Sequence, residues 1–256
     1  MKMLAAILVA AATVVAAATC ISPKADCDAY PDACRNVTQL IISNGYPVEA
    51  VTATTEDGFV LSMQRIPPRR RAAGAGAAPA VLLQHGFLDA SHTWVINDRG
   101  HSLAFLLSDR GYDVFLGNNR GNCYSMRSTR YSNDTDAFWA YSFDEMAQYD
   151  VIAQLDAAAR VSGQSKVAYV GHSQGTLQMF LALAHPNSTV AARVAKRVSV
   201  FGALAPVAYL THLSSYVVRE LAHVPRAVLH FVLGRQAFPS QHQDDVLRRW
   251  APGVCA

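Results

Sequence analysis

Two kinds of hydrophobic pattern divide the chain. Residues 51–55 and 59–66 alternate between apolar and polar side chains on either side of the turn Glu56-Asp57-Gly58, and this alternation predicts a β-hairpin. Further along, short apolar runs are nearly continuous, which is typical of strands buried on both faces of a parallel sheet. These runs cover residues 80–84, 113–116, 166–170 and 198–204.

Helical spacing separates these predicted strands. Residues 102–110 and residues 143–162 place apolar side chains on one helical face, and each segment is followed by a glycine, a residue that often ends a helix. A third helix is predicted over residues 174–184, ahead of Pro186. Strands that alternate with helices predict an α/β fold, with a mostly parallel central sheet covered by helices.

The two ends of the chain differ from this core. Residues 1–19 combine a positive start, a long apolar stretch and a cluster of small residues, which predicts a secretory signal peptide, with an uncleaved signal anchor as the alternative. No later segment reaches the length of a span, so we expect no transmembrane span in the mature chain. The predicted parts are 1–19 signal peptide, 20–66 lead and hairpin, 67–79 flexible loop, 80–206 core and 207–256 partial helical cap.

Composition and charge argue against a nucleic-acid partner. The net charge is +3 and charged residues make up 16% of the chain, as in an ordinary globular protein. The dense basic run at residues 69–71 lies in the predicted loop, and no nucleic-acid-binding motif accompanies it. The simpler interpretation of this basic run is a solvated surface segment.

Sequons and cysteines agree with export. Three N-x-S/T sequons are expected to be glycosylated if they are exposed: Asn36, Asn133 and Asn187. Together with the signal peptide they predict secretion, or delivery to a vacuole or lysosome through the secretory pathway. Cys27 and Cys34 are close enough in sequence to pair, but the connectivity of the five cysteines stays open.

The strongest chemical signal is the G-x-S-x-G pentapeptide of residues 171–175. A bare match is weak, but this one directly follows a predicted buried strand and directly precedes a predicted helix, the context that a nucleophile elbow requires. The sharp turn would present Ser173 Oγ above the sheet, at a helix N-terminus whose dipole favours developing negative charge. We therefore predict Ser173 as a nucleophile.

An oxyanion hole is expected beside this serine. In a strand–elbow–helix arrangement one donor is the backbone N–H after the nucleophile, here that of Gln174, and the other comes from the loop after an earlier strand. Residues 84–88 follow such a strand, so we assign the second donor to the N–H of Phe87, with Leu88 as the near alternative.

Longer stretches carry a resemblance to a known family. They are ISNGYP (42–47), TEDG (55–58), RIP (65–67), LQHG (83–86), SLAF (102–105), GYDV (111–114), GNNRGN (117–122), FWAYSFDEM (138–146) and ALAPVA (203–208). In these the chain resembles the acid lipases, which include gastric lipase, lysosomal acid lipase and their plant and insect relatives within the α/β-hydrolase superfamily. The resemblance implies hydrolysis of neutral-lipid esters, triacylglycerols or sterol esters, at a lipid–water interface beneath a helical cap.

The rest of a catalytic triad has no evident position. On this fold an acid and then a histidine follow the serine on loops after later strands. One predicted strand follows Ser173, and the residues after it read as cap helices over 210–222, 227–233 and 246–250. We assign no triad role to the downstream candidates, which are Glu220, Asp244, Asp245, His185, His212, His223, His230 and His242. We therefore expect the chain to be truncated at its C-terminal end, without the last strands.

These patterns leave three functions open. The first is a serine ester hydrolase that lacks activity at this length if its acid and base are absent. The second is a non-catalytic secreted protein, derived from a lipase, that binds lipid or another partner, and the third is an acyltransferase or peptidase on the same fold. No metal-binding spacing and no dinucleotide or phosphate loop occurs in the sequence, so we expect no metal and no cofactor.

Overall fold

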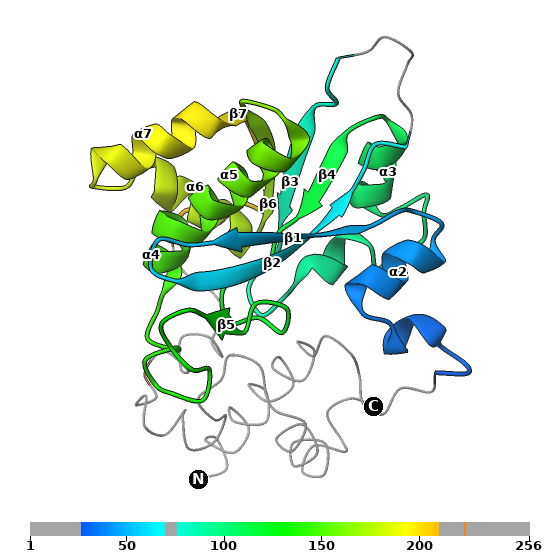
Figure 1. Cartoon of the computed structure of the whole chain (residues 1–256), viewed down its shortest axis with the longest axis horizontal. Coiled ribbons are helices and arrows are strands. Elements are labelled where there is room, and N and C mark those ends of the chain that lie inside the picture. Colours follow the sequence, from blue (N-terminus) through cyan, green and yellow to red (C-terminus); the bar gives the residue numbers. More distant parts are fainter. Residues whose placement is uncertain (1–26, 70–75, 210–222, 224–256) are drawn as a thin grey trace. The chain divides into compact units, whose positions relative to one another are not determined.

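The computed structural model describes residues 27–69, 76–209 and 223. The chain divides into two compact units, one of residues 20–208 and the other of residues 1–19 with 209–256. The helices and strands below belong to the first unit (Figure 1). The predicted signal peptide, the centre of the predicted loop 67–79 and the predicted cap helices lie outside the described residues.

A seven-stranded mixed sheet forms the centre of this unit. In chain order its strands are β1 (Glu49–Thr54), β2 (Phe59–Ile66), β3 (Ala80–Gln84), β4 (Asp113–Leu116), β5 (Arg127–Ser128), β6 (Val167–His172) and β7 (Val198–Leu204). The spatial order is β1-β2-β4-β3-β6-β7, with β5 paired to β2. Neighbours among β4, β3, β6 and β7 are parallel, and the antiparallel β1–β2 hairpin extends this sheet through β2 and β4.

Helices cover both faces of the sheet. In chain order they are η1 (Pro31–Cys34), α2 (Val37–Ser43), η2 (Ser91–Trp94), α3 (Leu103–Asp109), α4 (Phe143–Glu145), the π-helical turn η3 (Met146–Asp150), α5 (Val151–Ser162), α6 (Gln174–Leu183) and α7 (Ser188–Arg197). On β3, Leu82 belongs to the core formed with α5 and α6, whereas Leu83 belongs to the core formed with α2 and α3. Helices α5, α6 and α7 accordingly lie on one side of the sheet, and α3 on the other (Figure 1).

The predicted fold class is confirmed, and four predicted strands match their observed bounds. The predicted helix 143–162 is wrong as a single α-helix, because the π-helical turn η3 interrupts it between α4 and α5. Helices α2 and α7 were not predicted. Each is capped by the asparagine of a sequon, and α7 buries Val190 and Val194 on one face.

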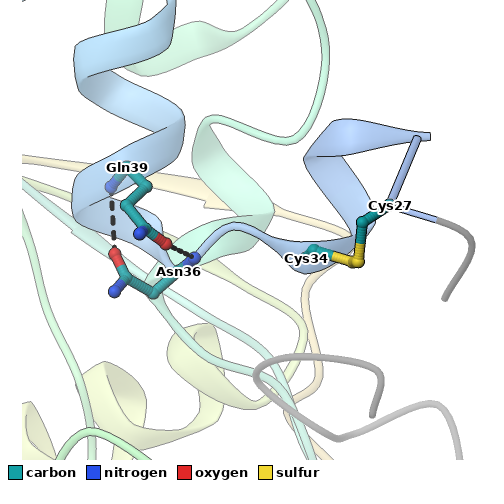
Figure 2. Close-up of a disulfide and its surroundings, with 4 residues drawn as sticks. All are labelled: Cys27, Cys34, Asn36 and Gln39. Atoms are coloured by element: carbon teal, nitrogen blue, oxygen red, sulfur yellow. Dashed lines mark hydrogen bonds between the residues drawn. A yellow bond between two sulfur atoms is a disulfide. The ribbon is translucent and has the colours of Figure 1, made fainter. Parts of the chain in front are cut away.

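Figure 2 shows how the N-terminal segment is held. Cys27 and Cys34 form a disulfide, the local pair that their spacing allowed. Next to it, Asn36 begins α2 with a capping box: its Oδ1 accepts the N–H of Gln39, and Gln39 Oε1 accepts the N–H of Asn36, both at 2.9 Å. The disulfide and the capping box together hold the segment that leads into α2.

A buried ion-pair cluster joins the β1–β2 hairpin to the parallel part of the sheet. Arg120 lies in the loop after β4, and its guanidinium donates to Asp150 in η3 and to both carboxylate oxygens of Asp57 in the hairpin turn. The guanidinium also lies 4.1 Å from the centre of the Phe59 ring. Burial opposes ionisation of Asp57, but the hydrogen bonds from Arg120 and Thr55 hold the pKa of this carboxyl below its usual value.

Candidate functional site

Ser173 lies in a sharp turn between β6 and α6, as predicted. Its backbone has φ 50° and ψ −111°, a conformation that L-residues rarely adopt and that costs energy unless the surroundings impose it. The first turn of α6 begins at the next residue, Gln174, so the serine occupies the N-terminal end of a ten-residue helix. The local geometry is that of a nucleophile elbow.

The two glycines of the pentapeptide are required by close backbone approaches. A Cβ on Gly171 would lie 2.6 Å from the carbonyl of Gly175, and a Cβ on Gly175 would lie 2.6 Å from the carbonyl oxygen of Gln84. The first contact closes the turn itself, and the second places the start of α6 directly against the end of β3. Side chains at either position would push the helix away from the sheet.

The loop after β3 lies against this turn. Gln84 pairs with Gly171 in the parallel register of β3 and β6, so both strands end at the same edge of the sheet. A Cβ on Gly86 would lie 3.4 Å from Ser173 Cβ and 3.1 Å from His172 Nδ1. The chain leaves β3 towards β4 and leaves β6 in the opposite direction towards β7, which makes this edge a topological switch point, where α/β proteins bind ligands.

The predicted oxyanion donors flank Ser173 at this edge. Phe87 follows Gly86 in the loop after β3, and Gln174 is the first residue of α6. Within the described part of the chain, no protein acceptor takes the backbone N–H of Phe87, Leu88 or Gln174. Leu88 has φ 51°, so the loop turns sharply just after Phe87.

His85 holds the loop after β3 in place through hydrogen bonds of both ring nitrogens. Its side chain is buried, and burial lowers the pKa of the imidazole, which is therefore neutral near pH 7. Nδ1 lies 2.8 Å from the carbonyl oxygen of Gly86, so Nδ1 carries the proton and donates it. Nε2 accepts from the backbone N–H of Asn119 and from Nδ2 of Asn122, each at 3.2 Å.

The segment 117–122 after β4 forms a buried polar network behind this loop. Asn118 is fully buried; its Oδ1 accepts from the N–H of Ser91 and from Nδ2 of Asn122, and its Nδ2 donates to the carbonyl of Ser62. The network links β2, the loop after β3 and the loop after β4. Sequence reasoning did not assign this role, although polar residues directly after a buried strand were a usable signal.

Three apolar residues close to this turn, Phe87, Phe143 and Leu204, are called here the apolar rim. The Phe87 side chain is 63% exposed and its ring packs edge-on against Phe143, with centroids 6.4 Å apart. Leu204, at the end of β7, is 43% exposed, and its carbonyl oxygen accepts the N–H of Ser173 at 3.0 Å. Exposed apolar residues thus belong to both segments that contact Ser173, the loop after β3 and the end of β7.

Family models match two parts of the chain. The partial α/β-hydrolase lipase region matches residues 37–98, and the α/β-hydrolase fold matches residues 79–222, more than half of the chain. The chain is an α/β hydrolase. Among curated relatives, human gastric triacylglycerol lipase is 43% identical over 228 residues, which cover 88% of this chain and 55% of that protein.

Two other relatives of this α/β hydrolase show similar identity and coverage. The rat gastric triacylglycerol lipase is 41% identical over 85% of this chain and 54% of its own length. The human lysosomal acid lipase/cholesteryl ester hydrolase is 39% identical over 82% of this chain and 52% of its own length. The predicted resemblance to the acid lipases is therefore confirmed, and the chain spans about half the length of the curated relatives it matches.

The described part of the chain brings no acid–base pair to the serine. Among the described residues, no histidine or carboxylate side chain is hydrogen-bonded to Ser173 Oγ. His185 instead accepts the N–H of Asn187 at the start of α7. The other downstream candidates, His212, His230, His242, Glu220, Asp244 and Asp245, lie outside the described residues, and His223 is described but belongs to the other unit.

The predicted sequon residues are accessible to different degrees. Asn133 and Asn187 are exposed, and Asn36 is partly exposed. Asn36 and Asn187 cap helices through their Oδ1 atoms, which leaves the Nδ2 atom, the point of glycan attachment, outside the capping bond. In the described residues, no group of three or more His, Cys, Asp or Glu side chains has the arrangement of a metal site, and no helix there has the length and hydropathy needed to cross a bilayer.

Proposed function

We propose that this α/β hydrolase is a lipase-type serine ester hydrolase with Ser173 as its nucleophile. The observation that carries the proposal is the strained turn at Ser173, in contact with the loop that follows β3. Strain of this kind is retained where the surrounding structure imposes it, and nucleophile elbows are such places. The N-terminal end of α6, where Ser173 lies, adds a dipole that favours negative charge at the serine.

The reaction would run as acyl transfer. Ser173 Oγ bonds to the ester carbonyl carbon, the serine proton passes to a general base, and the carbonyl electron pair moves onto oxygen, where the N–H groups of Gln174 and Phe87 stabilise it. The bond to the alkoxy oxygen then breaks and the alcohol leaves with the proton. Water then bonds to the acyl carbon and gives a proton to the general base. The bond to Ser173 Oγ breaks, the serine takes up that proton, and the carboxylic acid leaves.

Neutral-lipid esters are the substrate class we favour. The named relatives act on triacylglycerols or cholesteryl esters, and the apolar rim of Phe87, Phe143 and Leu204 suits an acyl chain better than a charged group. We further propose that the chain enters the secretory pathway by residues 1–19, is glycosylated at Asn36, Asn133 and Asn187, and works at a lipid–water interface outside the cell or in a vacuole or lysosome.

One observation favours a second candidate, a non-catalytic lipid-binding protein. Within the described residues no histidine or carboxylate is bonded to Ser173 Oγ, so the general base is not among the contacts of the serine. An elbow without a base would still present an apolar rim to lipid. The two candidates differ in one respect, which is whether ester bonds are broken.

Hydrolysis measurements separate the two. The secreted chain and its Ser173→Ala variant would be assayed on nitrophenyl butyrate and emulsified triolein at acidic and neutral pH, with circular dichroism to show that both are folded. Hydrolysis by the wild type that is lost in Ser173→Ala supports the lipase. Binding of triolein emulsion without hydrolysis, equal in the two proteins, supports the lipid-binding alternative.

A further inference from the structure

Two strained turns lie side by side at the ends of β6 and β7. Ser173 follows β6 with φ 50°, and Ala205 follows β7 with φ 47°. His172 pairs with Leu204 in the parallel register of the two strands. Ser173 and Ala205 each follow one member of this pair, so the two strained residues are neighbours. A non-glycine residue keeps a positive φ where neighbouring contacts impose it. The contacts that do so here are identifiable.

Thr176 connects the two turns with a single hydroxyl. Its Oγ1 donates to the carbonyl oxygen of Ser173 at 2.7 Å and accepts the backbone N–H of Val207 at 2.9 Å. One donated and one accepted bond is the ordinary capacity of a threonine hydroxyl. The Thr176 side chain is fully buried, so water does not compete for either bond.

The Ser173 backbone is therefore tied at both of its polar groups, to β7 and to the segment that follows β7. Its N–H donates directly to the carbonyl oxygen of Leu204 at 3.0 Å. Its carbonyl oxygen reaches Val207 through the hydroxyl of Thr176. Pro206 has no N–H, so the N–H of Val207 is the first backbone donor after the strained Ala205. Val207 also lies one residue before Ala208, the last residue of this compact unit.

We propose that Thr176 is a positioning residue that locks the nucleophile turn to the point where the chain leaves the α/β unit. Its hydroxyl touches no reacting atom and acts through the Ser173 carbonyl and the Val207 N–H. Without the hydroxyl, the Ser173 carbonyl keeps the backbone N–H groups of Thr176 and Leu177, at 3.0 and 3.4 Å, but the link to Val207 through the side chain is lost. This inference rests on the proposed role of Ser173.

The test compares Thr176→Val, which has the same shape without the hydroxyl, with Thr176→Ser, which keeps the hydroxyl. Thr54→Val, on an exposed position of β1, is the control. The first readout is hydrogen exchange of the Val207 amide, which does not depend on activity. The second is the rate at which a fluorophosphonate is captured at Ser173, divided by the fraction of folded protein.

We expect Thr176→Val to speed exchange of the Val207 amide by about fivefold or more, the factor that corresponds to one hydrogen bond. Capture at Ser173 should slow in the same variant, and Thr176→Ser should restore both. Unchanged exchange, or faster exchange with unchanged capture, would overturn the positioning role. Absence of capture in the wild type, with exchange still responding to Thr176→Val, would instead overturn the role of Ser173 and leave Thr176 as a structural link.

Discussion

The guanidinium of Arg120 and the carboxylate of Asp150 form an ion pair that solvent does not reach. Nε of Arg120 lies 2.8 Å from Oδ1 of Asp150, the two side chains are 1% and 0% exposed, and the Arg120 backbone N–H donates to the second carboxylate oxygen at 3.0 Å. The pair connects the loop after β4 to the π-helical turn η3. Because Arg120 also holds Asp57, it fixes the β1–β2 hairpin to the edge of the sheet that carries Ser173.

Removing Asp150 should therefore be costly. Asp150→Ala leaves a buried guanidinium with half of its partners, and we expect the free energy of unfolding to fall by about 3–5 kcal/mol. Asp156→Ala is the matched control, because Asp156 pairs with Arg197 at 40% exposure and should change stability by less than about 1 kcal/mol. Urea denaturation measures both. Equal effects of the two substitutions would contradict a special role for the buried pair.

Strain at Ser173 predicts an unusual order of stabilities. Glycine adopts the observed φ of 50° without steric cost, whereas alanine does not. Ser173→Gly should therefore be more stable than Ser173→Ala by about 1–3 kcal/mol, the range of such local strain, although glycine usually destabilises relative to alanine. Thermal unfolding compares the stability of the two variants. An alanine variant as stable as the glycine variant would contradict the strain at Ser173.

Close approach of α6 to β3 predicts the effect of a single methyl group at Gly175. A Cβ there would lie 2.6 Å from the Gln84 carbonyl oxygen, so Gly175→Ala should push the helix away and destabilise the unit by about 1–3 kcal/mol. Gly202→Ala on β7 is the control, since its Cβ would meet Val170 at an ordinary 3.4 Å. Urea denaturation should show a loss for the first variant and little change for the second. A loss in Gly202→Ala alone would contradict this packing.

One buried and one partly buried histidine predict a loss of stability in mild acid. Burial lowers the pKa of both His85 and His92 below the ordinary value of 6.5. As pH falls below that value, the unfolded chain takes up protons that the folded chain does not, so the free energy of unfolding decreases by up to about 1.4 kcal/mol per pH unit for each histidine. His92→Gln should make this decrease shallower between pH 7 and 5. An unchanged slope in urea titrations would contradict the assignment of His92.

The parts that sequence could predict are those with short-range signals. The hairpin is set by the alternation around Glu56-Asp57-Gly58, and the turn at Ser173 is set by five adjacent residues between a strand and a helix. Buried runs such as 80–84 and 113–116 predict β3 and β4 because both faces of each strand are covered. These signals need no knowledge of distant residues.

What sequence could not predict depends on residues far apart in the chain. Arg120 is separated from Asp150 by 30 positions and from Asp57 by 63, so no local pattern indicates that the three charges pair with one another. The link from Thr176 to Val207 spans 31 positions and depends on the register of β6 with β7. The π-helical turn η3 continues the same apolar face as α5, so periodicity alone does not reveal it.

The central claim is that Ser173 is an activated nucleophile. The most direct measurement is labelling of the folded, secreted chain with a fluorophosphonate, in which Ser173 Oγ bonds to phosphorus and fluoride leaves, followed by mass spectrometry of the digested protein. If Ser173 is activated, stoichiometric adduct forms on the peptide that contains Ser173, and none forms in Ser173→Ala. A folded wild-type chain that acquires no adduct at Ser173, or that is labelled equally in the Ser173→Ala variant, would contradict this claim.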